Sequence, residues 1–132
     1  MDHLSPAQVE QLQAKLRAEA SALQASLAGQ ADALAAAEAP DPRDIEDAAA
    51  EEAGSFRAAQ LRERERARLA EVEAALARID DGDYGVCEDT GEDIPFRRLE
   101  LEPTARLTVE AQEQREGEAG VDDPHANEPV GY

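Results

Sequence analysis

The sequence is poor in the residues that usually build a large hydrophobic core. Aromatic residues make up 3% of its 132 residues, and tryptophan is absent. Alanine, glutamate, leucine, arginine and glutamine dominate instead, a composition typical of long helices and coiled coils. The length suits one domain, or one domain with an extension. We therefore expect a mainly α protein rather than a domain built around a large globular core.

Basic residues are also scarce, because 13 lysines and arginines stand against 31 aspartates and glutamates, for a formal net charge of -18. Such a charge opposes binding to bare nucleic acid, whose phosphates would repel the protein. It permits binding to a basic protein surface, such as those that line an enzyme acting on nucleic acid. We therefore expect no direct, sequence-specific binding to nucleic acid, whereas the charge is compatible with a protein partner.

The scarcity of cysteine and the absence of long apolar runs indicate where in the cell the protein is located. The chain has a single cysteine, Cys87, so no disulfide can form within it. No apolar run approaches the roughly 18 residues of a membrane span, and no signal peptide precedes the first helical pattern. These features predict a soluble, cytoplasmic protein that does not bind membranes.

Two long helical patterns fill most of the chain. Ser5 and Pro6 supply an expected N-cap and first helical residue. Pro40 and Pro42 interrupt the first pattern, and a second begins near Arg43 or Asp44. Apolar residues recur at coiled-coil spacing in both: Val9, Leu12, Leu16, Leu23, Leu27 and Leu34, then Leu69, Val72, Leu76 and Ile79. The patterns predict a long antiparallel coiled-coil helical hairpin, with arms roughly 45 to 55 Å long at 1.5 Å per residue.

The seam of the second arm is weak in its middle. Arg62 and Glu65 occupy projected seam positions, where a stable dimeric zipper would need apolar residues. This pattern favours a monomer whose long rod reaches into a partner. A purely structural coiled-coil protein is the alternative.

A short segment after the hairpin looks like the first half of a zinc finger. In "YGVCEDTGEDIP", Cys87 follows one turn and precedes another, but Thr90 stands where a finger needs its next metal ligand. Thr104 is then expected to cap a last helix from Ala105 to about Glu116. The expected segments are a first coiled-coil arm with the N-terminal helical region (1–36), a hairpin tip (37–47), a second arm (48–80), a finger-like lobe with a C-terminal helix (81–116) and a flexible tail (117–132).

Residues 81–112, "DGDYGVCEDTGEDIPFRRLELEPTARLTVEAQ", resemble the globular segment of the DksA/TraR family of bacterial transcription factors. That family's pattern is Cys-x-x-Cys-Gly, an Ile, Arg-Arg-Leu, a Pro, and a second Cys-x-x-Cys at the start of a helix. The four ligand positions of this C4-type finger become Cys87, Thr90, Thr108 and Ala111 at unchanged spacing.

The hairpin carries a second part of the resemblance. Asp44, Asp47 and Ala49 match the family's Asp-x-x-Asp-x-Ala tip motif. Arg64 corresponds to the arm arginine that contacts the polymerase rim in the family. The simpler reading of the two aspartates is that acids are favoured in the first turn of any helix.

The resemblance implies a zinc finger that has lost its zinc. Threonine and alanine cannot replace thiolates, and the chain's histidines, His3 and His125, lie in its flanks. We expect no bound zinc, a Cys87 that serves as a small half-buried hydrophobe, and acidic neighbours that raise its thiol pKa. Such a protein would suit zinc starvation.

Apolar packing is expected to replace the metal, because so small a lobe rarely folds without an additional stabilising element. The lobe would pack on the base of the hairpin or against the first helix. The candidate residues are Tyr84, Val86, Ile94, Phe96, Leu99, Leu101, Leu107 and Val109.

For function, the resemblance implies a transcription regulator that is not an enzyme and that binds RNA polymerase. In the family the hairpin enters the secondary channel and destabilises open complexes at stringently controlled promoters, together with guanosine tetraphosphate. Here Glu71 and Glu102 stand where the family has basic positions around the alarmone. Arg64, Arg97 and Arg98 are the expected polymerase contacts, although Arg97 and Arg98 could instead form internal salt bridges.

A transcript-cleavage-type factor is a further alternative. It also presents an acidic hairpin tip to the same channel. Its carboxylates would help hold a catalytic magnesium ion.

Overall fold

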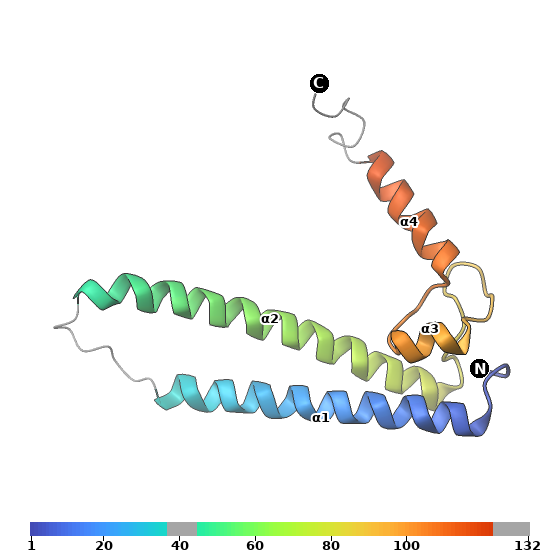
Figure 1. Cartoon of the computed structure of the whole chain (residues 1–132), viewed down its shortest axis with the longest axis horizontal. Coiled ribbons are helices and arrows are strands. Elements are labelled where there is room, and N and C mark those ends of the chain that lie inside the picture. The colour runs from blue at the N-terminus through green and yellow to red at the C-terminus, as the bar shows by residue number, and fades with distance from the viewer. Residues whose placement is uncertain (37–44, 123–132) are drawn as a thin grey trace. The chain divides into compact units, whose positions relative to one another are not determined.

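The computed structural model describes residues 1–36 and 45–122. Helix α1 spans Pro6–Ala36, α2 spans Ile45–Asp81, α3 spans Phe96–Leu101 and α4 spans Val109–Asp122 (Figure 1). An isolated antiparallel bridge joins Val86 to Asp93. The predicted fold class is confirmed: a mainly α chain with a helical hairpin, a small finger-like lobe and a C-terminal helix. None of the described helices is long and apolar enough to cross a membrane.

The chain divides into two compact units. The hairpin unit is Gln13–Ala77. The lobe unit combines Met1–Leu12 with the residues from Arg78 onward. Residues 1–12, which the sequence analysis grouped in one segment with the first coiled-coil arm and the N-terminal helical region, belong to the lobe unit.

The start of α1 is stabilised by a reciprocal pair of hydrogen bonds. The Gln8 amide donates to Ser5 Oγ at 3.1 Å, and the Ser5 amide donates to Gln8 Oε1 at 2.9 Å. This capping box satisfies two backbone donors that a helix start otherwise leaves unpaired. The predicted N-cap at Ser5 is confirmed.

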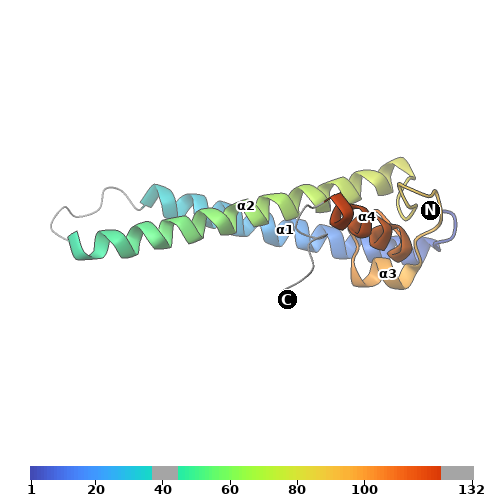
Figure 2. The same ribbon diagram turned by 90° about the horizontal axis from the view of Figure 1, so that it is seen from above.

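In the hairpin unit, α1 and α2 run antiparallel and side by side (Figures 1 and 2). The seam buries Leu16 and Ala20 of α1 together with Val72 and Ala75 of α2. It loosens toward the end of α1, where Leu34 is 52% exposed. The well-packed part of the seam therefore lies in the half of the unit that contains these four residues.

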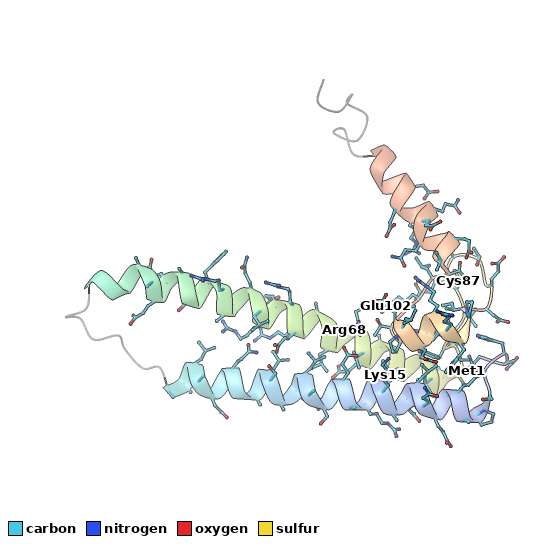
Figure 3. The ribbon with its side chains drawn as sticks, viewed as in Figure 1. Met1, Lys15, Arg68, Cys87 and Glu102 are labelled. Atoms are coloured by element: carbon cyan, nitrogen blue, oxygen red, sulfur yellow. The ribbon has the colours of Figure 1, made fainter. Side chains whose placement is uncertain are left out.

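Two polar pairs cross the hairpin seam. Arg68, labelled in Figure 3, donates to both carboxylate oxygens of Glu19, at 2.5 and 3.1 Å. Further along, Gln30 Nε2 donates to Glu65 at 2.9 Å. Such pairs contribute little net stability, but they favour one register because a shifted register would leave their polar groups unpaired. The polar seam position predicted at Glu65 thus has a matched partner on α1.

The N-terminal segment packs into the lobe unit at Gly85. This glycine has a φ of 79°, and a Cβ there would lie 3.2 Å from His3 Cε1 and 3.3 Å from Leu4 Cδ1. His3 Nε2 lies 2.7 Å from the Ile94 carbonyl oxygen, and Nδ1 lies 3.4 Å from an oxygen of Asp93. Glycine is needed here both for the left-handed backbone and for this close approach.

The expected apolar set is only partly buried. Tyr84, Ile94 and Leu99 are buried completely, whereas Leu101 is 78% exposed and Val109 is 44% exposed. The prediction was wrong for the last two residues. Leu101 follows the buried Leu99 by two positions, and Val109 precedes the buried Ala111 by two. Positions two apart on a helix point to different faces. Val86, Phe96 and Leu107 are partly exposed.

The last helix begins later than predicted. Thr108 caps α4, because its Oγ1 accepts a hydrogen bond from the Ala111 amide at 3.2 Å. Thr104, the predicted cap, is buried instead, and its carbonyl oxygen lies 3.4 Å from Arg78 Nη2. At its other end α4 continues to Asp122, past the expected end near Glu116.

Candidate functional site

The four former ligand positions lie together in the lobe unit. Cys87 and Thr90 belong to the loop after α2, while Thr108 and Ala111 begin α4. Thr108 Oγ1 lies 3.9 Å from Cys87 Sγ, and the side chain of Thr90 hydrogen-bonds the same sulfur. Cys87, Thr108 and Ala111 are buried. The two half-sites therefore adjoin each other in the structure.

The residues at this site do not fit a zinc ion. They provide one thiol, two hydroxyls and a methyl group, whereas structural zinc takes four sulfur or nitrogen ligands. Within residues 1–36 and 49–118, no group of three or more histidine, cysteine, aspartate or glutamate residues could hold a metal.

The Cys87 thiol, labelled in Figure 3, is buried among hydrogen-bond donors. Burial raises the pKa, but hydrogen bonds from the Thr90 hydroxyl and from the backbone amides of Thr108, Thr90 and Asp89 lower it more. The net effect is to lower the pKa of Cys87 from its ordinary 9.0 to about 7. The expectation that acidic neighbours raise this pKa was wrong, because it overlooked the amides that converge on the sulfur.

Polar contacts join the two half-sites where a metal would otherwise join them. The Glu88 amide donates to the Arg106 carbonyl at 2.9 Å, and their side chains form an ion pair at 3.3 Å. Arg115 of α4 binds both carboxylate oxygens of Asp89, one of them at 2.6 Å. The Arg115 guanidinium thereby lowers the pKa of Asp89.

Sequence reasoning missed these contacts because it looked for apolar replacements of the metal. A signal was present in the alternation of charge. Glu88 and Asp89 follow the remaining cysteine, and Arg106 and Arg115 flank the second half-site. Because both ion pairs are partly exposed, each adds a modest increment, and the buried core carries most of the stability.

The two adjacent arginines, Arg97 and Arg98, differ in their contacts. Arg98 donates from Nε to the Leu107 carbonyl at 2.9 Å, and its guanidinium contacts the side-chain oxygen of Gln112. Arg98 therefore ties α3 to the segment before α4 and to α4 itself. It does so through a carbonyl and an amide, rather than through the internal salt bridge considered above. Arg97 is exposed, and within the described residues it forms no ion pair or hydrogen bond.

The other predicted contact positions lie on α2. Arg64 and Ala49 are exposed. Asp44 lies outside the described residues. Asp47 belongs to the first turn of α2, but its side chain also lies outside the described part of the chain.

Glu71 and Glu102, which the resemblance places where the family has basic residues, are both exposed. Glu71 lies on α2 in the hairpin unit. Glu102, labelled in Figure 3, ends α3 in the lobe unit, where its amide donates to the Arg98 carbonyl at 2.8 Å.

Sequence comparison finds two kinds of similarity. Residues 82–117 match the family described as prokaryotic dksA/traR C4-type zinc finger. The RNA polymerase-binding transcription factor DksA of Caulobacter vibrioides is 44% identical over 73 residues, which are 55% of this chain and 51% of that protein. General stress protein 16O of Bacillus subtilis is 50% identical over 64 residues, which are 48% of this chain and 39% of that protein. The matched segments thus span about half of the first relative's length and about two fifths of the second's.

Solved structures extend the similarity to most of the chain. Transcription factor DksA2 from Pseudomonas aeruginosa has a TM-score of 0.78 and 37% identity, covering 87% of this chain and 88% of that one. An RNA polymerase binding protein from Chlamydia trachomatis has a TM-score of 0.53 at 21% identity, a likeness of fold alone. Hairpin, lobe and matched segment together show that this chain belongs to the DksA/TraR family.

Proposed function

We propose that this protein regulates transcription initiation by binding bacterial RNA polymerase through its secondary channel, without structural zinc. The observation that carries the proposal is the long hairpin joined in one chain to a family lobe whose metal positions are filled by other contacts. In the proposal the acidic tip acts near the polymerase active centre and destabilises open complexes at stringently controlled promoters. No covalent chemistry by this chain is involved.

The dimensions of the hairpin support this role. Helix α1 has 31 residues and α2 has 37. At 1.5 Å per residue they are about 46 and 55 Å long, which is enough to reach a site buried inside a large enzyme. The Glu19–Arg68 and Gln30–Glu65 pairs favour a single register between the arms. A fixed register matters because it keeps the tip residues at a constant distance from the contacts along the arms.

Contacts with the polymerase are proposed at exposed arginines. Arg64 on α2 and Arg97 on α3 are exposed, and neither forms an ion pair within the described residues. Arg98 is a weaker candidate than the sequence suggested, because its guanidinium already bonds Leu107 and Gln112.

The alarmone is proposed as a co-regulator that this chain contacts only weakly. Guanosine tetraphosphate carries several negative charges, and Glu71 and Glu102 are exposed carboxylates at the family's basic positions. Repulsion between like charges would weaken any contact there. We further propose that the protein acts in the cytoplasm and as a monomer. Its independence of zinc would be useful when zinc is scarce.

The tip is tested with Asp44→Asn and Asp47→Asn, which remove charge while nearly keeping shape. Both variants should occupy polymerase as the wild type does, yet fail to inhibit a ribosomal RNA promoter in vitro. Arg64→Ala should show the opposite pattern, with weaker binding that higher protein concentration overcomes. Full repression by Asp47→Asn at equal occupancy would contradict the proposal.

Assays with the wild-type protein and RNA polymerase also distinguish the proposed function from the two alternative functions. A transcript-cleavage factor would shorten RNA in stalled complexes when magnesium is present, and the wild-type protein should not do so. A structural coiled-coil protein would not bind polymerase at all. RNA cleavage would therefore support a transcript-cleavage factor, and an absence of polymerase binding would support a structural coiled-coil protein.

A further inference from the structure

One face of α2 carries an exposed aromatic residue beside an exposed arginine. Phe56, Ala59, Gln60, Glu63 and Arg64 line a shallow surface depression. Counted from Phe56, they follow at intervals of three, four, seven and eight residues, so they share one side of the helix. We call this surface the Phe56 face.

The Phe56 face points away from α1. Glu65, which accepts a hydrogen bond from Gln30 of α1, comes nine residues after Phe56. Nine residues are about two and a half helical turns, so the two positions lie on opposite sides of α2. Phe56 is accordingly 65% exposed and takes no part in the seam.

An exposed phenylalanine is unusual in this chain. There are only two phenylalanines and two tyrosines, and Tyr84 is fully buried. Burying such a side chain stabilises a protein, so a ring left in water adds nothing comparable to the folded hairpin. A partner that covers the ring would recover that free energy on binding.

The charge on the face indicates the chemistry of the partner. Glu63 forms an ion pair with Arg66 at 3.0 Å. Arg64 is exposed and forms no ion pair within the described residues. The face thus combines an aromatic ring with an unneutralised guanidinium in a chain of net charge -18. Nucleic acid and anionic lipid would be repelled by the rest of the molecule, whereas a protein surface can present a carboxylate to Arg64 locally. Aromatic and arginine side chains are also enriched at the energetic centres of protein interfaces.

We infer that Phe56 anchors this protein on RNA polymerase, with its ring in an apolar pocket beside a carboxylate that pairs with Arg64. The inference rests on the proposed function and adds to it a specific binding residue and the chemistry of its receptor. Phe56 and Arg64 act together because they sit on one face, eight residues and about two turns apart.

The chain offers a matched control. Leu61 is also an exposed apolar residue of α2, at 46%, but it follows Phe56 by five residues and lies off the face. The experiment measures competition of wild type, Phe56→Ala, Leu61→Ala, Arg64→Ala and the Phe56→Ala/Arg64→Ala double variant for purified polymerase. Circular dichroism checks that each variant keeps its helix content.

Phe56→Ala should weaken binding by at least about tenfold, as loss of an interface anchor does. Leu61→Ala should change it by no more than about twofold. The double variant should lose less than the product of the single effects, because the two residues serve one contact. Equal binding by Phe56→Ala and Leu61→Ala would overturn the inference and leave the proposed function intact. Failure of the wild type to bind would instead overturn the proposed function. Wild-type self-association that Phe56→Ala abolishes would identify a second copy as the occupant and also refute the inference.

Discussion

Leu99→Ala tests whether a packed core sustains the lobe unit in the absence of zinc. Leu99 is fully buried on α3. Its Cδ1 atom approaches Gly85 so closely that a Cβ there would lie 3.4 Å away. Replacing leucine by alanine at a buried site costs about 2 to 5 kcal/mol, depending on how far the surroundings collapse into the space.

The surroundings of Leu99 are held in place, so we expect the upper part of that range. The Ile94 amide bonds the Gly85 carbonyl at 2.8 Å, and the Tyr84 hydroxyl donates to the Pro103 carbonyl at 2.7 Å. These bonds resist a collapse that would fill the cavity. We therefore expect a loss of about 3 to 5 kcal/mol, which corresponds to opening roughly a hundredfold to several thousandfold more often.

Amide hydrogen exchange measures this loss separately in each unit. The Cys87 and Ile94 amides, each hydrogen-bonded at 2.8 Å, report on the lobe, while amides in the middle of α1 report on the hairpin unit. Leu101→Ala is the matched control, because Leu101 ends the same helix but is 78% exposed, and it should change exchange very little. If both variants exchange like the wild type, the lobe is not held by its core and the reasoning fails.

The remaining predictions concern metal and pH. Purified protein should contain far less than one zinc per chain, and a chelator should leave its melting temperature unchanged; zinc that stays at one per chain through dialysis would contradict the fit argued from Thr90, Thr108 and Ala111. Because the pKa of Cys87 falls to about 7 in the folded state from an ordinary 9.0, the thiolate's contribution is complete above about pH 9 and lost as pH falls through about 7. The free energy of unfolding should therefore rise between these values, by up to roughly 3 kcal/mol. Cys87→Ser should abolish the rise, and identical pH profiles for the two proteins would refute the assignment.

The hairpin was predictable because it depends on the spacing of apolar residues, which can be seen in each short stretch of the sequence. Leucines at three- and four-residue spacing and the break at Pro40 and Pro42 were enough to place both arms. The four finger positions were predictable because their spacing survives although the ligands do not.

The lobe's contacts were harder to predict, because they join residues that are distant in sequence. His3 reaches the Ile94 carbonyl across 91 positions, and nothing around His3 indicates that partner. The start of α4 was misplaced for a different reason. Thr104 and Thr108 are equally good cap residues by type, and only the burial of Thr104 and the Thr108–Ala111 hydrogen bond distinguish them.

The lobe unit has a consequence for the hairpin, because it contains one end of each arm. Leu12 of α1 and Ile79 of α2 are buried within it, and Arg78 donates to the Thr104 carbonyl. The first residues of α1 and the last of α2 are thus held in one core together with the former finger. A zinc ion would stabilise such a core through four bonds that a chelator can remove together. Here the same task is divided among buried side chains, ion pairs and the His3 contact, none of which depends on the supply of a metal. The arms should therefore keep their register at this end when zinc is withdrawn, as the proposed action of the tip requires.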